Sequence, residues 1–111
     1  MKIELKLSTD ELVCINNQLQ QSYGRRYDSV EIYNVVHSIA QDLADRFDSK
    51  TKSIIKKANL FEAKKKTKIS LKYYEAWALK AYLTASIVSI ENDYQRTLSQ
   101  KQINNLDQQL K

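Results

Sequence analysis

The chain has 111 residues, with one glycine, no proline and one cysteine, and its formal net charge is +5 at pH 7. This length predicts a single domain, residues 1–111, and the shortage of turn-forming residues disfavours a strand-rich fold. The composition also excludes an internal disulfide, a glycine-rich phosphate-binding loop and an apolar run of about 18 residues that could span a bilayer.

Three further features bear on where the protein acts. The opening MKIELKLSTDEL lacks the apolar segment of a signal peptide, and a lone cysteine suits a reducing compartment. Lysine outnumbers arginine, and asparagine and isoleucine are frequent, as in proteins encoded by the AT-rich DNA of low-GC bacteria, their phages and mobile elements. We therefore expect a cytoplasmic protein, with a phage or mobile element as one source.

The chain opens with a strand pattern, because Ile3, Leu5 and Leu7 alternate with charged residues. The same form, Lys-Ile-x-Leu-Lys, recurs within residues 67–72. Two isolated strands in a helical chain most simply pair with each other, since their backbone groups need hydrogen-bond partners. We predict a minor two-stranded β-ribbon of residues 2–7 with residues 67–72.

A first helix is predicted from Thr9 to Tyr23. Ser8 and Glu11 have the spacing of a capping box, in which each side chain binds the backbone N–H of the other residue. The residues that then share one helical face are Leu12, Ile15, Asn16, Leu19 and Tyr23. Cys14 falls on the opposite face, and we expect no chemical role for its thiol.

A second helix follows, capped by Asp28 or Ser29. Its apolar stripe comprises Ile32, Val35, Val36, Ile39, Ala40, Leu43 and Phe47. His37, the only histidine, lies at the flank of this stripe, where we expect a surface or boundary residue. Because Lys50 falls on the apolar face, we predict a break near residues 49–53 with a separate basic helix beyond it; one continuous helix is the alternative.

The third helix, predicted from Tyr73 to Leu98, has two apolar faces. One holds Tyr74, Trp77, Ala78, Ala81, Ala85 and Val88, and the other holds Leu79, Leu83, Ile87, Ile90 and Tyr94. A helix that is apolar on two sides lies at the centre of its fold or at a subunit contact. We predict a mainly α fold, a small helical bundle around this helix, with Tyr74 and Trp77 in the core and Tyr73 exposed.

A short fourth helix is predicted to begin at Ser99, which has capping-box spacing to Gln102. Its apolar stripe, together with the exposed Tyr73, is the candidate surface for a protein partner or a second copy: Tyr73, Ile103, Leu106 and Leu110. The sequence has no catalytic, metal-binding or cofactor-binding motif. It therefore predicts a non-enzymatic interaction or accessory protein that self-associates and needs no cofactor.

Basic residues support an alternative function. Between Arg46 and Lys72 the chain has ten basic and two acidic residues, a net charge of +8. The candidate polyanion-binding residues are Arg25, Arg26, Lys56, Lys57, Lys64, Lys65, Lys66, Lys68 and Lys72. These side chains could bind nucleic-acid phosphates; the favoured interpretation is a solvated turn whose lysines protect an edge strand.

A third and weaker hypothesis is peripheral attachment to a membrane. The basic segment of residues 50–66 would lie on the bilayer surface, with Ile54, Ile55, Leu60 and Phe61 inserted. We expect no membrane partner.

Overall fold

The computed structural model describes residues 2–24, 31–57 and 66–111. Its helices are α1 (Thr9–Gln20), α2 (Glu31–Lys57), α3 (Tyr73–Ser86) and α4 (Asp93–Leu110), and its strands are β1 (Lys2–Leu7) and β2 (Thr67–Lys72). Short 3₁₀ turns follow α1 at Gln21–Gly24 and α3 at Ile87–Ser89. The prediction of a mainly α fold with a minor two-stranded ribbon is confirmed.

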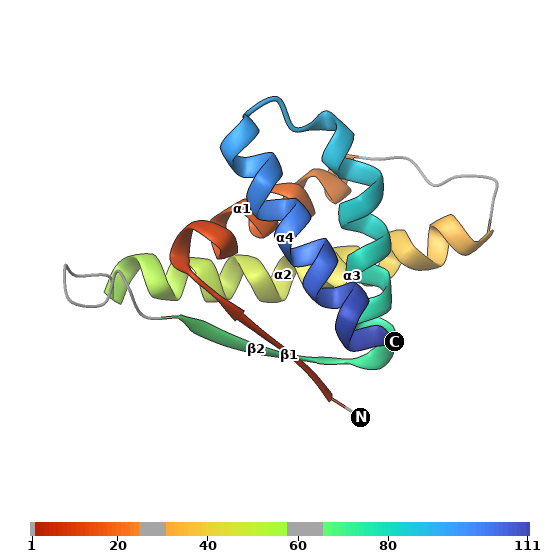
Figure 1. Ribbon diagram of the computed structural model, residues 1–111, viewed down its shortest axis with the longest axis horizontal. Helices are drawn as coiled ribbons and strands as arrows, with labels where there is room; N and C mark the ends of the chain where they lie inside the picture. The colour runs from red at the N-terminus through yellow and green to blue at the C-terminus, as the bar shows by residue number, and fades with distance from the viewer. Residues whose placement is uncertain (1, 25–30, 58–65) are drawn as a thin grey trace.

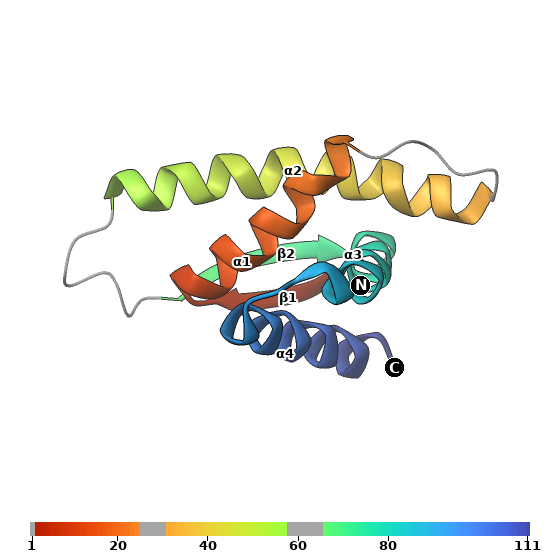
Figure 2. The ribbon, with the colours of Figure 1, turned by 90° about the horizontal axis from the view of Figure 1, so that it is seen from above.

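The elements form three layers (Figure 2). α2 runs along one side and α4 along the other, and α1, the ribbon and α3 lie between them. Both α1 and α3 contact α2 as well as α4. The central position that the sequence assigns to the third helix is therefore shared by α1 and α3.

The ribbon pairs β1 with β2 in antiparallel orientation, with Leu5 opposite Ile69. Its inward side chains are buried, and they are Ile3, Leu5, Leu7, Ile69 and Leu71. They join the apolar side chains of the four helices in one core cluster. The ribbon thus closes one end of the core, below the helices in Figure 1.

The capping box at the start of α1 is confirmed. The backbone N–H of Ser8 donates to Glu11 Oε1 over 2.9 Å, and the backbone N–H of Glu11 donates to Ser8 Oγ over 3.2 Å. Cys14 is buried, because the face of α1 that it occupies packs against α4, and its Sγ donates to the carbonyl of Gln95 over 3.3 Å. Burial raises the pKa of this thiol, with a smaller contribution from the charge of Glu11.

The predicted break near residues 49–53 is wrong, and the alternative of one continuous helix is confirmed. The apolar stripe continues from Phe47 to Thr51, which is buried, while Lys50 points into solvent. The hydroxyl of Thr51 donates to the carbonyl of Phe47 over 2.7 Å. The buried Thr51 hydroxyl therefore has a hydrogen-bond partner within its own helix, so its burial leaves no polar group unpaired.

His37 is buried, so the prediction that it is a surface or boundary residue is wrong. Its Nε2 lies 2.7 Å from the backbone carbonyl oxygen of Ser22, in the turn after α1. The imidazole ring is therefore enclosed between α2 and this turn, a contact that the position of His37 on its own helix does not reveal.

α3 ends at Ser86, well before the predicted end at Leu98. The hydroxyl of Ser86 donates to the carbonyl of Tyr82 over 2.9 Å, within the last turn. The side chain of Asn92 then accepts from the backbone N–H of Gln95 over 3.0 Å and caps a new helix. The residues predicted as one long helix therefore form the antiparallel hairpin of α3 and α4, joined through the turn at Ile87–Ser89 (Figure 1).

The predicted start of the last helix at Ser99 is also wrong, because Ser99 and Gln102 lie inside α4 and are buried. Ser99 Oγ donates to Gln18 Oε1 over 2.7 Å, and Gln102 Nε2 donates to Glu11 Oε2 over 2.6 Å. The two polar side chains therefore bind α1 across the core and do not cap a helix.

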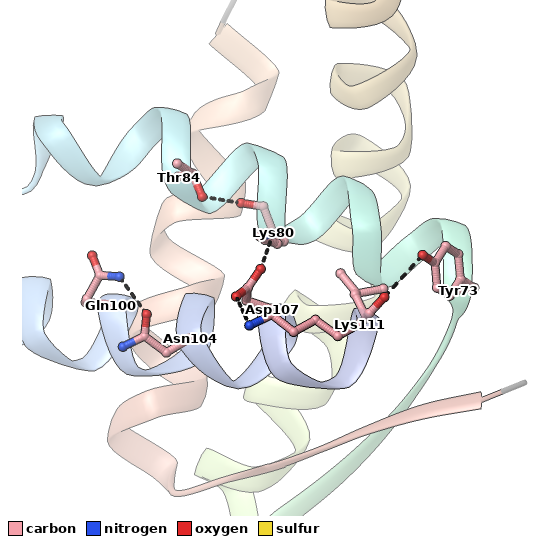
Figure 3. A network of polar contacts seen from close by, with 8 residues as sticks. Tyr73, Lys80, Thr84, Gln100, Asn104, Asp107 and Lys111 are labelled. Atoms are coloured by element: carbon pink, nitrogen blue, oxygen red, sulfur yellow. Dashed lines mark hydrogen bonds and ion pairs between the residues drawn. The ribbon is translucent and has the colours of Figure 1, made fainter.

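Polar contacts also join α3 to α4 along their exposed edge (Figure 3). Lys80 Nζ lies 2.6 Å from Asp107 Oδ1, and Lys111 Nζ lies 3.6 Å from Asp107 Oδ2. The hydrogen bond from Lys80 lowers the pKa of the Asp107 carboxyl group. At the open end of the hairpin, Tyr73 OH donates to the carbonyl of Leu110 over 3.4 Å.

Candidate functional site

The outward face of the ribbon carries four lysines. The antiparallel register places Lys2 opposite Lys72 and Lys6 opposite Lys68, and all four side chains are exposed. Facing residues in such a ribbon have Cβ atoms about 5 Å apart, and the two pairs lie roughly 13 Å apart along the strands. These four residues are called the lysine face.

One carboxylate lies among these lysines. Glu4 is opposite Ser70, midway between the two lysine pairs. Its Oε2 is 3.8 Å from Lys68 Nζ, and both side chains are at least half exposed. An ion pair this long and this exposed is weak in water, so the lysine face keeps a positive potential.

A second carboxylate near the ribbon, that of Glu75, is held away from solvent by hydrogen bonds. Glu75 Oε2 lies 2.6 Å from Arg46 Nη1, and Glu75 Oε1 accepts from the backbone N–H of Lys72 over 2.9 Å. Arg46 Nη2 also donates to the carbonyl of Ser70 over 3.0 Å. The acidic residue in the first turn of α3 is therefore paired with a cation.

The structure describes only some of the basic residues predicted to bind a polyanion. Arg25, Arg26, Lys64 and Lys65 lie outside the described residues. Lys57 is the last residue of α2, and Lys56, just before it, is exposed. Lys66 is exposed immediately before β2. Lys68 and Lys72 belong to the lysine face.

Lys2 and Lys6 were not among the predicted binding residues. The charge count from Arg46 to Lys72 excluded them, because they lie far away in the sequence. The signal was nevertheless present, since alternate residues of two paired strands share one face. Lys2 and Lys6 alternate with buried apolar residues as Lys68 and Lys72 do.

Exposed aromatic side chains follow the lysine face in the first turns of α3. Tyr74 is 52% exposed and Trp77 is 39% exposed, so the prediction that they are core residues is wrong. The buried face of α3 is formed instead by Ala76, Ala78, Leu79, Tyr82, Leu83 and Ser86. Lys72 Nζ lies 5.9 Å from the centre of the Tyr74 ring, which places this ring beside one lysine of the lysine face. Tyr73 is exposed, as predicted.

The apolar stripe of the last helix is not a free surface. Ile103 and Leu106 are buried in the core of their own chain, and Leu110 is partly buried against it. Of the four candidate interaction residues, only Tyr73 is exposed. The reason is that α4 uses this stripe to cover the layer formed by α1, α3 and the ribbon.

A different apolar surface is exposed at the start of α2. Ile32 is 48% exposed, Tyr33 60% and Val35 45%; these three residues are called the α2 strip. Further along the helix, Val36 and Ile39 pack partly against the core. The first turns of α2 extend beyond the other described helices (Figures 1 and 2), which leaves the α2 strip uncovered by them.

The four apolar residues that the membrane hypothesis inserts into a bilayer do not form one exposed surface among the described residues. Ile54 packs against the core, Ile55 is exposed, and Leu60 and Phe61 lie outside the described residues. Among the described helices, none combines the length and the apolar character needed to cross a bilayer. Within residues 2–24, 31–57 and 66–111, no three histidine, cysteine or acidic side chains gather as a metal site.

No protein-family model, curated protein or solved structure matches the chain. Its function must therefore be inferred from the charges and exposed side chains described above.

Proposed function

We propose that the protein is a small, non-enzymatic, cytoplasmic accessory protein that binds nucleic acid through the lysine face. The observation that carries this proposal is the ribbon register, which holds Lys6 against Lys68 and Lys2 against Lys72. Like charges directly opposite each other destabilise a ribbon. The fold does not require them, because uncharged polar residues suit an exposed strand face equally well.

A polyanion offsets this repulsion when it binds. A nucleic-acid duplex carries one negative charge per about 1.7 Å of its axis, so several lysines of one face can contact phosphates at once. A competing explanation is that the lysines only prevent the ribbon from pairing with strands of other chains. Glutamate is also charged and would still oppose such pairing, so the two explanations predict different results for charge reversal.

The test is the salt dependence of binding to a fluorescently labelled oligonucleotide, followed by anisotropy. Four phosphate contacts predict a slope of about −3.6 for a duplex and about −2.8 for a single strand in a plot of log K against log salt concentration. Lys6→Glu should reduce the slope by roughly one unit and the low-salt affinity by on the order of tenfold. Lys50→Glu, an exposed position on α2, is the matched control with the same change in net charge.

The proposal fails if the wild-type protein does not bind at low salt. It also fails if Lys6→Glu and Lys50→Glu weaken binding equally, because net charge alone would then explain the interaction. Pelleting with anionic vesicles, but no binding to the oligonucleotide, would assign the lysine face to a membrane instead.

The α2 strip favours a second function, self-association with another copy of the chain. Residues 32–41 contain no aspartate, glutamate, lysine or arginine, although 28% of the chain is charged. In a two-fold symmetric dimer the same patch meets itself, so a patch with a net charge would face an equal net charge of the same sign. The exposed side chains of Ile32, Tyr33 and Val35 lie in an uncharged segment, which avoids this repulsion.

This second function is tested by light scattering at increasing protein concentration. Ile32→Glu should convert an assembly into a monomer, because two α2 helices packed through the α2 strip would bury the new carboxylates. Ile55→Glu is the matched control, since Ile55 is also exposed on α2 but lies near its other end. A wild-type monomer at the highest concentration, or an assembly that Ile32→Glu leaves intact, would refute self-association through this strip.

A further inference from the structure

We infer that the ligand of the lysine face is single-stranded nucleic acid, whose bases stack on Trp77 and Tyr74. This inference rests on the proposed function, and it adds the strandedness of the ligand and the residues that determine it. The two rings are three residues apart in the first turns of α3, so they project from the same side of the helix. Both are exposed, and α3 begins directly after β2.

The exposure of these rings is not explained by the core. The hydrophobic effect favours burial of large apolar rings, and α3 buries its leucines and Tyr82 on another face. Lys72, whose backbone leads directly into α3, places its Nζ 5.9 Å from the Tyr74 ring centre. A cation and an aromatic face are thus held side by side, as a nucleotide requires for its phosphate and its base.

The charge of the intervening residue supports the same ligand. Glu75 lies between Tyr74 and Trp77 in the sequence, and a free carboxylate there would repel phosphates. Its two oxygens instead bind the backbone N–H of Lys72 and the guanidinium of Arg46. Tyr74 therefore adjoins Lys72 of the lysine face without an unpaired Glu75 carboxylate between the two rings.

Strandedness follows from access to the bases. In a duplex each base is stacked between its neighbours and presents only its edges to a protein. In a single strand the faces of the bases are free to stack on aromatic side chains. Lysines alone would bind both forms through phosphates, so a preference for single strands would have to come from the two rings.

The experiment compares three polyanions: a single-stranded oligonucleotide of about 16 nucleotides, its duplex, and heparin, which has charge but no bases. Trp77 is the only tryptophan, so its fluorescence reports stacking directly. The single strand should quench this fluorescence and bind more tightly than the duplex, and heparin should bind without quenching. Trp77→Ala should weaken single-strand binding about tenfold and leave heparin binding unchanged.

Two variants control for structure. Trp77→Phe keeps a ring and should retain most of the single-strand affinity, and Val88→Ala, at an exposed position beyond the far end of α3, should have no effect. If all three polyanions bind without quenching and Trp77→Ala is neutral, the stacking inference is overturned while the lysine face remains a polyanion site. If no polyanion binds, both proposals fail.

Discussion

Gln102 donates a hydrogen bond of 2.6 Å to the carboxylate of Glu11, across 91 residues of sequence. Glu11 is almost fully buried, and its other oxygen accepts from the backbone N–H of Ser8. Lys101 Nζ lies 3.2 Å from the carboxylate at the protein surface. One side chain therefore caps α1 and also binds α4 to it, so the charge of Glu11 is coupled to the packing of two helices.

This arrangement predicts a contribution to acid sensitivity. Burial raises the pKa of Glu11, but the hydrogen bonds from Ser8 and Lys101 outweigh it and hold the pKa below its ordinary value of 4.5. A carboxyl group whose pKa is lower in the folded state stabilises the fold above the unfolded-state pKa. This stability is lost as the pH falls below 4.5 and through the folded-state pKa.

Glu11→Gln tests this by urea unfolding at pH 7 and near pH 3.5. At pH 7 the variant should be less stable by about 1–3 kcal/mol, because the partners of the carboxylate lose a charged acceptor. The difference from wild type should shrink at the lower pH. The pKa values of Asp48 and Asp107 are also lowered. Both groups are present in the wild type and in the variant, so their contribution to the pH dependence of stability cancels in the comparison. A difference that stays constant with pH would contradict the assignment.

Replacing Lys6 by glutamate should stabilise the fold while it weakens nucleic-acid binding. The new carboxylate would face Lys68 directly and replace a repulsion by an attraction, a gain of about 0.2–1 kcal/mol. Glu4 lies two residues along the same strand, farther away than the facing lysine. Thermal unfolding measures this effect, with Lys50→Glu on α2 as the control. A less stable Lys6→Glu variant would show that the ribbon needs its lysine pair.

Gln18 is the centre of a buried polar network. Its Nε2 donates to Ser86 Oγ over 2.9 Å, and its Oε1 accepts from Ser99 Oγ over 2.7 Å. Gln18→Leu should destabilise the protein by about 1–3 kcal/mol, because it leaves the buried Ser99 hydroxyl without this acceptor. Adding Ser99→Ala should recover part of the loss. Urea unfolding of the single and double variants measures the coupling, and strictly additive effects would argue against it.

The continuity of α2 predicts opposite outcomes at two adjacent positions. Thr51 is buried and Lys50 is exposed. Thr51→Lys should reduce stability by roughly 2 kcal/mol or more, since it forces an ammonium group toward the core. Lys50→Thr should change stability by less than about 0.5 kcal/mol. Chemical unfolding of the two variants shows whether Thr51→Lys lowers the free energy of unfolding more than Lys50→Thr does. Equal effects would contradict the observed register of the helix.

The sequence by itself determined the features that depend on neighbouring residues. The alternation of Ile3 and Leu5 with charged residues predicted a strand, and the Ser8–Glu11 spacing predicted the start of α1. The pairing of the two strands also followed, because isolated strands need hydrogen-bond partners. In each case the stabilising contacts lie within about four residues, or follow from a general requirement of the backbone.

Only the tertiary structure decided which faces are buried. Trp77 has the spacing of a core residue and is exposed, whereas Ser99, Gln102 and Cys14 are buried, because α1 lies between α2 and α4. The lysine face likewise requires the register that brings Lys6 to Lys68. The physical reason is that burial and charge proximity depend on contacts between residues distant in the chain, which local periodicity and capping signals do not encode.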